Sequence, residues 1–437
     1  MSPARAQRTK KARRTENVGQ TKKVRRAPEP ILLPRGFSFN ALAAGIKASG
    51  RPDLALVEIA GGATAAALFT SNRVVAAPVE VGRASLAASG GRVRAVIVNS
   101  GNANCATGRA GVAACDRVCR EAATILGAGA KEIFPSSTGI IGVPLPDEKI
   151  RAKLTPLVEG CAAGIDDAEN FARAIMTTDT RPKIAAECVQ IRQAKPAQRG
   201  RSAASGEITI LGVAKGAGMI HPQLATMLVY IFTDAAATAG ELRDLLREAC
   251  DESFNCISID GDTSTNDTVL LLASGESGIR IRSGEVKKKF AAALNRVCAS
   301  LAEQIISDGE GVQHVIRLHV DKARSREEAL SVARTIAHSL LVKTAWAGAD
   351  PNWGRILAAV GRSGIAFDPS RVNIFIGRQK VCGKGMSVRF DQQKAHEALA
   401  APECDVRVEL GRGGAEVKFL TTDLTAEYVR INADYST

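Results

Sequence analysis

A glycine-rich loop near the middle of the chain ends in an Ala-Thr pair that could generate its own catalyst. The loop starts at Lys215 and runs through Gly216 and Gly218 to Ala225 and Thr226, directly before an apolar, strand-like run. If the bond between Ala225 and Thr226 is cut, Thr226 keeps a hydroxyl nucleophile and gains a free α-amine. The reference pKa of such an amine, about 8, suits a general base near neutral pH. The pair therefore raises the hypothesis of a self-processing acyl-transfer enzyme.

This cleavage requires a residue to attack its own backbone. The Thr226 hydroxyl would attack the Ala225 carbonyl in an N-to-O acyl shift, and hydrolysis of the ester would free the Thr226 amine. Gly216 and Gly218 permit the strained backbone that such an attack needs. A threonine at the start of a strand is also common for structural reasons, because β-branched residues favour strands. The pair alone therefore leaves both interpretations of Thr226 open.

A second cluster could stabilise the oxyanion that develops during acyl transfer. The segment Ser136-Ser137-Thr138-Gly139-Ile140-Ile141-Gly142 follows the strand-like residues 132–134. The hydroxyl of Thr138 and the backbone amide of Gly139 are donors of the kind that an oxyanion hole uses. By composition alone the segment is an ordinary turn, so this role too remains a hypothesis at this point.

The elements that must position these groups alternate between helical and strand-like patterns. Strand-like runs occur at 95–98, 208–213 and 227–232, and helical spacing of apolar residues occurs at 110–127, 242–249, 286–306 and 326–341. Residues 99–104 predict a polar turn at the end of a strand, and 193–205 predict an exposed loop. The pattern favours an α/β fold of layered, α+β type, in which helices pack against mixed sheets.

Composition narrows the class of protein. The 437 residues, 45% of them hydrophobic, suffice for one large or two moderate domains, and no apolar run is long enough to span a membrane. Of the net charge of +13, most comes from residues 1–30, which contain ten basic and two acidic side chains. This segment predicts a disordered basic tail and no base-reading chemistry, so nucleic-acid binding and an organelle transit peptide are less favoured than a solvated tail.

Cysteine, histidine and phosphate-binding patterns do not indicate a metal or a cofactor. The ten cysteines include no C-x-x-C pair, and Cys115 and Cys119 are spaced as two small residues on one helix face. The five histidines are dispersed, and only His221 adjoins the glycine-rich loop. Neither 377–385 nor 216–218 has the spacing of a nucleotide-binding loop. We therefore expect reduced thiols, no metal, no cofactor and a cytoplasmic protein.

The residues also carry a family resemblance. The segment 215–228, Lys-Gly-Ala-Gly-Met-Ile-His-Pro-Gln-Leu-Ala-Thr-Met-Leu, resembles the hallmark of the ornithine acetyltransferases of arginine biosynthesis, also called bifunctional glutamate N-acetyltransferases. Other blocks similar to the same family follow in order, at 69–72, 99–104, 137–142, 176–180, 260–268, 308–311, 348–355 and 428–437. The match spans roughly 34–437 and leaves only the basic tail outside. So many separate blocks make the resemblance specific.

The resemblance implies a self-processing, N-terminal-nucleophile-like acetyltransferase fold. It implies cleavage between Ala225 and Thr226, giving an α chain of residues 31–225 and a β chain of 226–437 that stay together, with an α2β2 heterotetramer as the expected assembly. Thr226 would carry the acetyl group in a ping-pong reaction between N-acetylornithine and glutamate. Whether acetyl-CoA also serves as a co-substrate stays open.

The resemblance also implies roles for individual residues. Thr138 and Gly139 would form the oxyanion hole beside the nucleophile Thr226. The substrate pocket would be lined by Thr177, Lys215, Thr226, Glu310, Asn432 and Thr437. In this pocket Lys215 can pair with an α-carboxylate and Glu310 with an amino group.

Two departures from the family pattern bear on specificity. Val312-Gln313-His314 stands where the family usually has Ala-Thr-Lys after the block at 308–311, which could change the charge beside Glu310 or face the surface. Trp346 replaces a smaller aliphatic residue. Two other classes of function stay open, a self-processing amidohydrolase or aminopeptidase of similar fold, and a non-enzymatic protein that binds polyanions through its tail.

Overall fold

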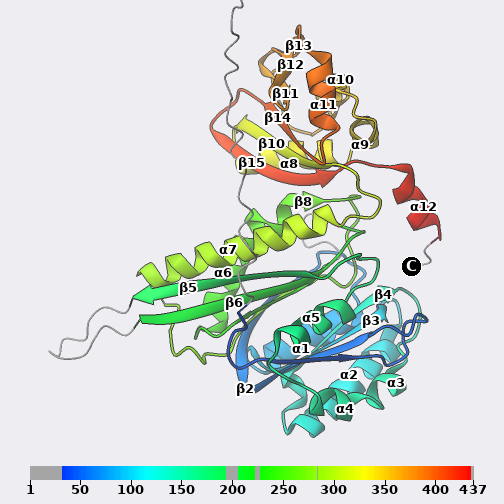
Figure 1. The fold of residues 1–437 in the computed structure, drawn as a ribbon, viewed down its shortest axis with the longest axis vertical. Coiled ribbons are helices and arrows are strands. Elements are labelled where there is room, and N and C mark those ends of the chain that lie inside the picture. Colours follow the sequence, from blue (N-terminus) through cyan, green and yellow to red (C-terminus); the bar gives the residue numbers. More distant parts are fainter. Residues whose placement is uncertain (1–31, 193–204, 222–226, 283, 435–437) are drawn as a thin grey trace, which may run out of the picture. The chain divides into compact units, whose positions relative to one another are not determined.

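The computed structural model describes residues 32–192, 205–221, 227–282 and 284–434 (Figure 1). These residues form two mixed β-sheets and twelve α-helices, which confirms the α/β fold class. The basic tail at 1–30 lies outside the described residues, as does the loop predicted at 193–205 except for Ser205, which begins the strand β6 (Ser205–Lys215). Within the described part of the chain, no helix is both long and apolar enough to cross a membrane.

The first sheet is built from strands on both sides of the Ala225-Thr226 junction. Its strand order is β4 (Ile133–Ile140), β3 (Arg92–Asn102), β2 (Leu54–Phe69), β9 (Thr268–Ala273), β7 (Leu228–Thr233), β6 (Ser205–Lys215) and β5 (Lys183–Arg192), and β1 (Ser38–Leu42) also pairs with β2. The pairs β3–β4 and β7–β9 are parallel and the others antiparallel. Because β7 and β9 lie between β2 and β6, a cut before β7 leaves both pieces in one hydrogen-bonded sheet.

Alternation along β7 shows why this strand lies in the interior of the sheet, between β9 and β6. Val229 and Ile231 point into a core shared with α6 (Ala239–Glu252) and α7 (Gly284–Ser307). Tyr230 and Phe232 point to the other face. There they meet the ring of Phe171 from α5 (Ile165–Ala174), with centroids 5.6 and 6.4 Å away. A strand that is buried on both faces is expected to be a continuous run of apolar residues, as residues 227–232 are.

Helix α7 packs closely on β5 and β6, as Figure 1 shows. A Cβ at Gly212 of β6 would lie 2.6 and 2.7 Å from side-chain atoms of Val297 and Leu301, so only glycine allows this approach. On the edge strand β5, the side chain of Gln304 accepts a hydrogen bond from the Ile184 N–H (3.1 Å) and donates one to its carbonyl (3.0 Å). These two hydrogen bonds pair the N–H and the carbonyl of Ile184, which would otherwise lack a partner at the edge of the sheet.

Helices α1 and α2 cover the β3–β4 end of the first sheet. They are followed by two short helices, and the four elements are α1 (Ala77–Ala88), α2 (Gly108–Leu126), α3 (Asp147–Arg151) and α4 (Leu154–Glu159). Cys115 and Cys119 lie buried on one face of α2, as their spacing predicted. All ten cysteines of the chain are free thiols.

The second sheet is formed entirely by residues after position 256. Its strand order is β13 (Met386–Ser387), β12 (Gln379–Gly383), β11 (Asn373–Ile376), β14 (Glu403–Glu409), β10 (Val315–Ala323), β15 (Ala415–Thr422) and β8 (Ile257–Ser258). Its helices are α8 (Arg326–Ala337), α9 (Leu340–Ala347), α10 (Trp353–Gly361) and α11 (Gln392–Leu399), and α12 (Ala426–Asp434) follows the last strand. The described residues also include three short 3-10 helices, at Ala130–Glu132, Phe254–Cys256 and Pro369–Arg371. Trp346 lies 1% exposed in the core of this sheet, so its departure from the family pattern concerns packing.

Three local predictions are wrong. Residues 99–102 and 136–140 were expected as turns, yet they continue β3 and β4. Strand pairing prevails there because polar side chains satisfy one another: Ser137 donates to Asn99 Oδ1 (2.6 Å), and Asn99 Nδ2 donates to the Asn102 carbonyl (2.9 Å). The helix expected over 326–341 breaks after Ala337, and Ser339 adopts an extended backbone before α9 begins.

Candidate active site

A pocket lies where β4, β6 and the glycine-rich loop approach α12. It has an empty volume of about 640 Å³, which includes space open to solvent at its mouth. Its walls include six of the predicted site residues, namely Thr138, Gly139, Thr177, Lys215, Glu310 and Asn432. The three others, Ala225, Thr226 and Thr437, lie outside the described residues.

Thr138 and Gly139 occupy the end of β4, beside β3. Gly139 has a φ of +134°, and a Cβ there would lie within 3.0 Å of backbone atoms of Gly101 and Asn102. Only glycine can therefore hold this conformation next to β3. Thr138 is buried, and its Oγ1 accepts a hydrogen bond from Lys215 Nζ (3.3 Å). Because the ammonium uses the acceptor side of this oxygen, the hydroxyl proton of Thr138 can donate into the pocket.

Lys215, the last residue of β6, places a buried cation in the wall of the pocket. Lys215 is only 3% exposed to solvent. Burial lowers the pKa of Lys215 below its usual value, although the nearby Asp179 carboxylate opposes this shift. A buried ammonium that has no carboxylate of its own within 4.0 Å among the described residues is well suited to bind a substrate carboxylate.

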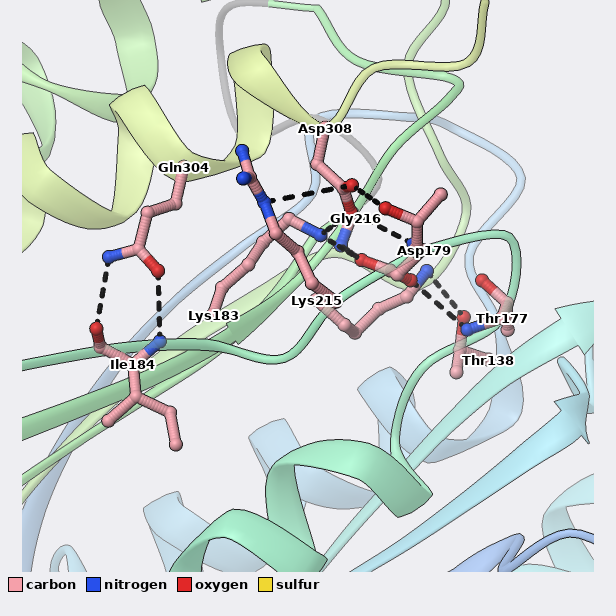
Figure 2. Close-up of polar contacts among 11 residues, drawn as sticks. Thr138, Thr177, Asp179, Lys183, Ile184, Lys215, Gly216, Gln304 and Asp308 are labelled. Carbon is pink, nitrogen blue, oxygen red and sulfur yellow. Dashed lines mark hydrogen bonds and ion pairs between the residues drawn. The ribbon is translucent and has the colours of Figure 1, made fainter.

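A network of buried charges holds the strand that carries Lys215. Figure 2 shows Lys183 Nζ between two carboxylates, 2.6 Å from Asp179 Oδ1 and 2.6 Å from Asp308 Oδ2. Asp179 also accepts hydrogen bonds from the N–H groups of Gly216 (2.7 Å) and Thr177 (3.1 Å). The network therefore ties two pocket segments, at Thr177 and at Gly216, to the end of α7.

Asp179 is expected to make stability sensitive to acid. Burial alone would raise its pKa, but Lys215 and Lys183 lower it to about 2, against about 3.9 in an unfolded chain. Its contribution, roughly 2–3 kcal/mol, is therefore present above about pH 4 and is lost as pH falls toward 2. We predict that Asp179→Asn loses roughly 3 kcal/mol of unfolding free energy at pH 7, because Lys183 and Lys215 are left with too little opposite charge.

Urea unfolding between pH 7 and pH 3 checks this expectation. The variant should show a flatter dependence of unfolding free energy on pH below about 4 than the natural chain. Asp166→Asn, an exposed acid on α5, is the matched control and should change neither quantity. Identical pH profiles for Asp179→Asn and the natural chain would contradict the role assigned to this carboxylate.

The glycine-rich loop is held in a strained shape on the side of the pocket. Gly216 has a φ of +153° and Met219, a non-glycine residue, has a φ of +57°. The Asp260 carboxylate fixes the loop by accepting hydrogen bonds from the N–H groups of Met219 (2.6 Å) and Ile220 (2.9 Å). Burial raises the pKa of Asp260 to about 6. The strain that the sequence suggested is thus present just before the described part of the loop ends at His221.

Glu310 and Asn432 form the acidic side of the pocket. Asn432 Nδ2 donates to Glu310 Oε2 (2.8 Å), and the Glu310 N–H donates to the Ala217 carbonyl (2.9 Å). A Cβ at Gly218 would collide with the Glu310 carboxylate, so glycine lets this acid approach the loop. The pocket therefore presents a cation at Lys215 and an anion at Glu310, a pairing that suits a zwitterionic ligand.

Several residues of the site were not predicted from the sequence. Asn266 lines the pocket and donates to the carbonyls of Ala103 (2.7 Å) and Ser137 (2.9 Å). Asp267 Oδ1 accepts a hydrogen bond from the N–H of Met227 (2.9 Å), the residue that follows Thr226. Both lie in the block at 260–268, whose resemblance to the family could have marked them. Lys183 has no such signal, because its role depends on contacts with α7.

The His314 departure lies away from this pocket. His314 is not among the lining residues, and its Nδ1 lies 3.0 Å from the carbonyl oxygen of Ala401. Within the described residues the change therefore contacts the segment between α11 and β14 and does not alter the charge of the pocket wall.

The chain is similar over nearly its whole length to a known protein family and to individual proteins of that family. A family-wide profile described as the ArgJ family matches residues 38–437. The arginine biosynthesis bifunctional protein ArgJ of Methylococcus capsulatus is 46% identical over 407 residues, 92% of this chain and 95% of that protein. The protein of the same name from Thermus thermophilus is 45% identical over 410 residues, 93% of this chain and 100% of that protein.

Solved structures of related proteins match about half of the chain. The ArgJ protein of Bacillus halodurans is 39% identical with a TM-score of 0.46, and the match covers 47% of this chain and 98% of that one. An ornithine acetyltransferase from Mycobacterium tuberculosis, complexed with ornithine, is 36% identical with a TM-score of 0.36, over 45% of this chain and 94% of that one.

Proposed function

This chain belongs to the ArgJ family, and we propose that it transfers an acetyl group from N-acetylornithine to glutamate through an acetyl ester on Thr226. The near full-length match to relatives named as bifunctional proteins of arginine biosynthesis makes the chain an enzyme of that pathway. One structural observation supports the proposed chemistry most directly. Met227 and Leu228, which follow Thr226, lie beside Thr138 and Lys215 around one narrow gap.

The first half-reaction moves the acetyl group to the enzyme. The Thr226 hydroxyl, deprotonated by its own α-amine, attacks the acetyl carbonyl of N-acetylornithine. The tetrahedral oxyanion accepts hydrogen bonds from the hydroxyl of Thr138 and the N–H of Gly139. The C–N bond then breaks, and ornithine leaves with the proton held by the Thr226 amine. In the second half-reaction the amine of glutamate attacks the acetyl ester and gives up a proton to the Thr226 amine. The ester C–O bond then breaks, Thr226 Oγ takes up this proton, and N-acetylglutamate leaves.

Charge in the pocket supports an amino-acid substrate. We assign Lys215 to the α-carboxylate and Glu310 to an amino group, with Thr177, Asn432 and Thr437 completing the pocket. Acetyl-CoA as a second acetyl donor belongs to the proposal as well, and no metal or other cofactor is required for the steps given above.

Self-processing and assembly form part of the same proposal. Cleavage between Ala225 and Thr226 gives an α chain and a β chain, and the interleaved strands β2, β9, β7 and β6 favour their lasting association. An α2β2 heterotetramer is the proposed assembly. Free thiols at all ten cysteines suit a reducing compartment, and a cytoplasmic enzyme is therefore proposed.

The rate of ornithine release distinguishes acetyl transfer from hydrolysis. With purified enzyme and N-acetylornithine, saturating glutamate should accelerate the release of ornithine at least about tenfold, because an amine held in place reacts much faster than water. Stoichiometric N-acetylglutamate should appear at the same time. Release at the same rate without glutamate, with acetate as the product, would instead identify an amidohydrolase. Removal of residues 1–30 should leave transfer intact, whereas loss of transfer would implicate the basic tail.

A further inference from the structure

A second pocket lies between α8 and His221, the last described residue of the glycine-rich loop. It has an empty volume of about 710 Å³, and its walls include Arg334, Arg362, His221 and His338. None of these four residues lines the pocket that contains Thr138 and Lys215. The second pocket thus gathers two guanidinium groups and two imidazoles that the acetyl-transfer reaction does not use.

Arg334 is the most informative of these groups. It forms no ion pair with any described residue, and its buried Nε has no hydrogen-bond partner among them. Arg334 is half-buried, and this burial lowers its pKa. Because Arg334 is half-buried and its Nε makes no hydrogen bond to a described residue, an acceptor that enters the pocket would pair with a polar group that is partly cut off from water.

The neighbouring groups keep this part of the pocket electropositive. Arg362 has no ion pair in the described residues, and its Nη2 donates to the Thr335 carbonyl (3.3 Å), so it also caps the end of α8. Burial and the charge of Arg334 lower the pKa of His221. Burial, His221, Lys343 and the two arginines lower the pKa of His338 to about 3. Both imidazoles therefore resist protonation, partly because the neighbouring side chains are already positively charged. A bound anion would offset this positive charge.

One carboxylate also lines the pocket, and its position limits its effect. Glu327 is exposed and lies seven residues before Arg334 on α8, about 10 Å away along the helix axis. A hydrogen bond with the Ser325 side chain lowers its pKa, so it stays ionised. Glu327 is therefore separated from Arg334 along α8, and the two arginines outnumber the one carboxylate in the pocket wall.

We propose that this second pocket binds a small oxyanion, a phosphate or carboxylate group, between Arg334 and Arg362. Guanidinium groups bind both through paired, charge-assisted hydrogen bonds. The proposal does not depend on the acetyl-transfer reaction, because none of the residues involved takes part in it.

The pocket contacts the same loop that forms one wall of the active site. His338 Nε2 lies 3.2 Å from His221 Nδ1 and 2.9 Å from Ser258 Oγ, and Ser258 Oγ donates to the Ile220 carbonyl (3.0 Å). Ile220 follows Met219, which lines the first pocket. The second pocket is therefore linked to this loop through His338 and Ser258, and binding in the second pocket is expected to affect turnover.

Isothermal titration calorimetry on the full chain tests the proposal directly. Inorganic phosphate and citrate are titrated separately, with glutamate saturating the first pocket, and at least one should bind at one site per chain. Arg334→Met and Arg362→Met should each weaken binding about tenfold or more, because each removes charge-assisted hydrogen bonds while keeping much of the apolar stem. Arg378→Met, an exposed arginine in the turn between β11 and β12, is the matched control and should leave the affinity unchanged.

Two other results would overturn the proposal. One is the absence of binding by both anions, or binding that neither pocket variant weakens, which would place the anion elsewhere. The other comes from thermal unfolding without added anion, where Arg334→Met should melt at the same temperature as the natural chain or higher. A clear decrease would show that Arg334 already has a structural partner and is not held ready for a ligand.

Discussion

Thr226→Ala is expected to abolish both the cleavage of the chain and its turnover. The natural protein should give two fragments on a denaturing gel, of roughly equal length, and the second should begin with Thr226 when its N-terminus is sequenced. The variant should give a single full-length band, because alanine has no hydroxyl to attack the Ala225 carbonyl. Its rate of acetyl transfer should fall at least about a thousandfold, since both the nucleophile and the α-amine base are missing.

The control for this substitution is Thr226→Ser, which keeps a hydroxyl at the same position. It should still cleave, more slowly, and retain measurable transfer. The two readouts also separate two explanations of a failure. A natural chain that stays intact yet transfers acetyl groups would exclude the free amine as the base. A Thr226→Ala chain that is still cut would show that the cut is made by another protease and not by Thr226.

Periodicity predicted the elements of the fold well where a strand or helix buries apolar side chains. The run 227–232 and the helical spacing at 286–306 correspond to β7 and α7. The predictions failed where polar residues form buried strands, at 99–102 and 136–140. Asn, Ser and Gly favour turns in isolation. Only the parallel pairing of β3 with β4 and the mutual hydrogen bonds of Asn99 and Ser137 explain the strand conformation, and these contacts join segments far apart in the sequence.

The site shows the same limit in a different form. Sequence motifs identified Thr138, Gly139 and Lys215 as candidate site residues. In the structure these three residues line one pocket together with Glu310 and Asn432. The charges that support them were not predictable in this way. Lys183 reads as an ordinary strand lysine, and it becomes a buried link between Asp179 and Asp308 only because α7 packs beside β5. Local patterns therefore identify groups that could react, whereas their electrostatic support depends on tertiary packing.

Thr138→Ala is expected to lower kcat for acetyl transfer about 10²- to 10³-fold, the effect of removing one donor from an oxyanion hole. The geometry supports this size of effect because Lys215 Nζ occupies the acceptor side of Thr138 Oγ1, which leaves the hydroxyl proton available for the developing oxyanion. Self-cleavage passes through a similar tetrahedral intermediate, so it should slow as well. KM should change little, because the donor acts mainly in the transition state.

Two variants serve as matched controls. One keeps a hydroxyl at position 138, and the other makes the same Thr-to-Ala change at a distant, exposed position. Thr138→Ser keeps the hydroxyl and should retain most of the activity, whereas Thr124→Ala, on the exposed side of α2, should change neither kcat nor cleavage. Rates are best measured on fully cleaved enzyme, so that slow processing is not mistaken for slow transfer. If Thr138→Ala raises KM at constant kcat, the hydroxyl binds ground-state substrate and the oxyanion assignment is wrong. If kcat falls while KM holds, Thr138 and Gly139 act where charge develops, and the strained end of β4 has a catalytic reason for its conformation.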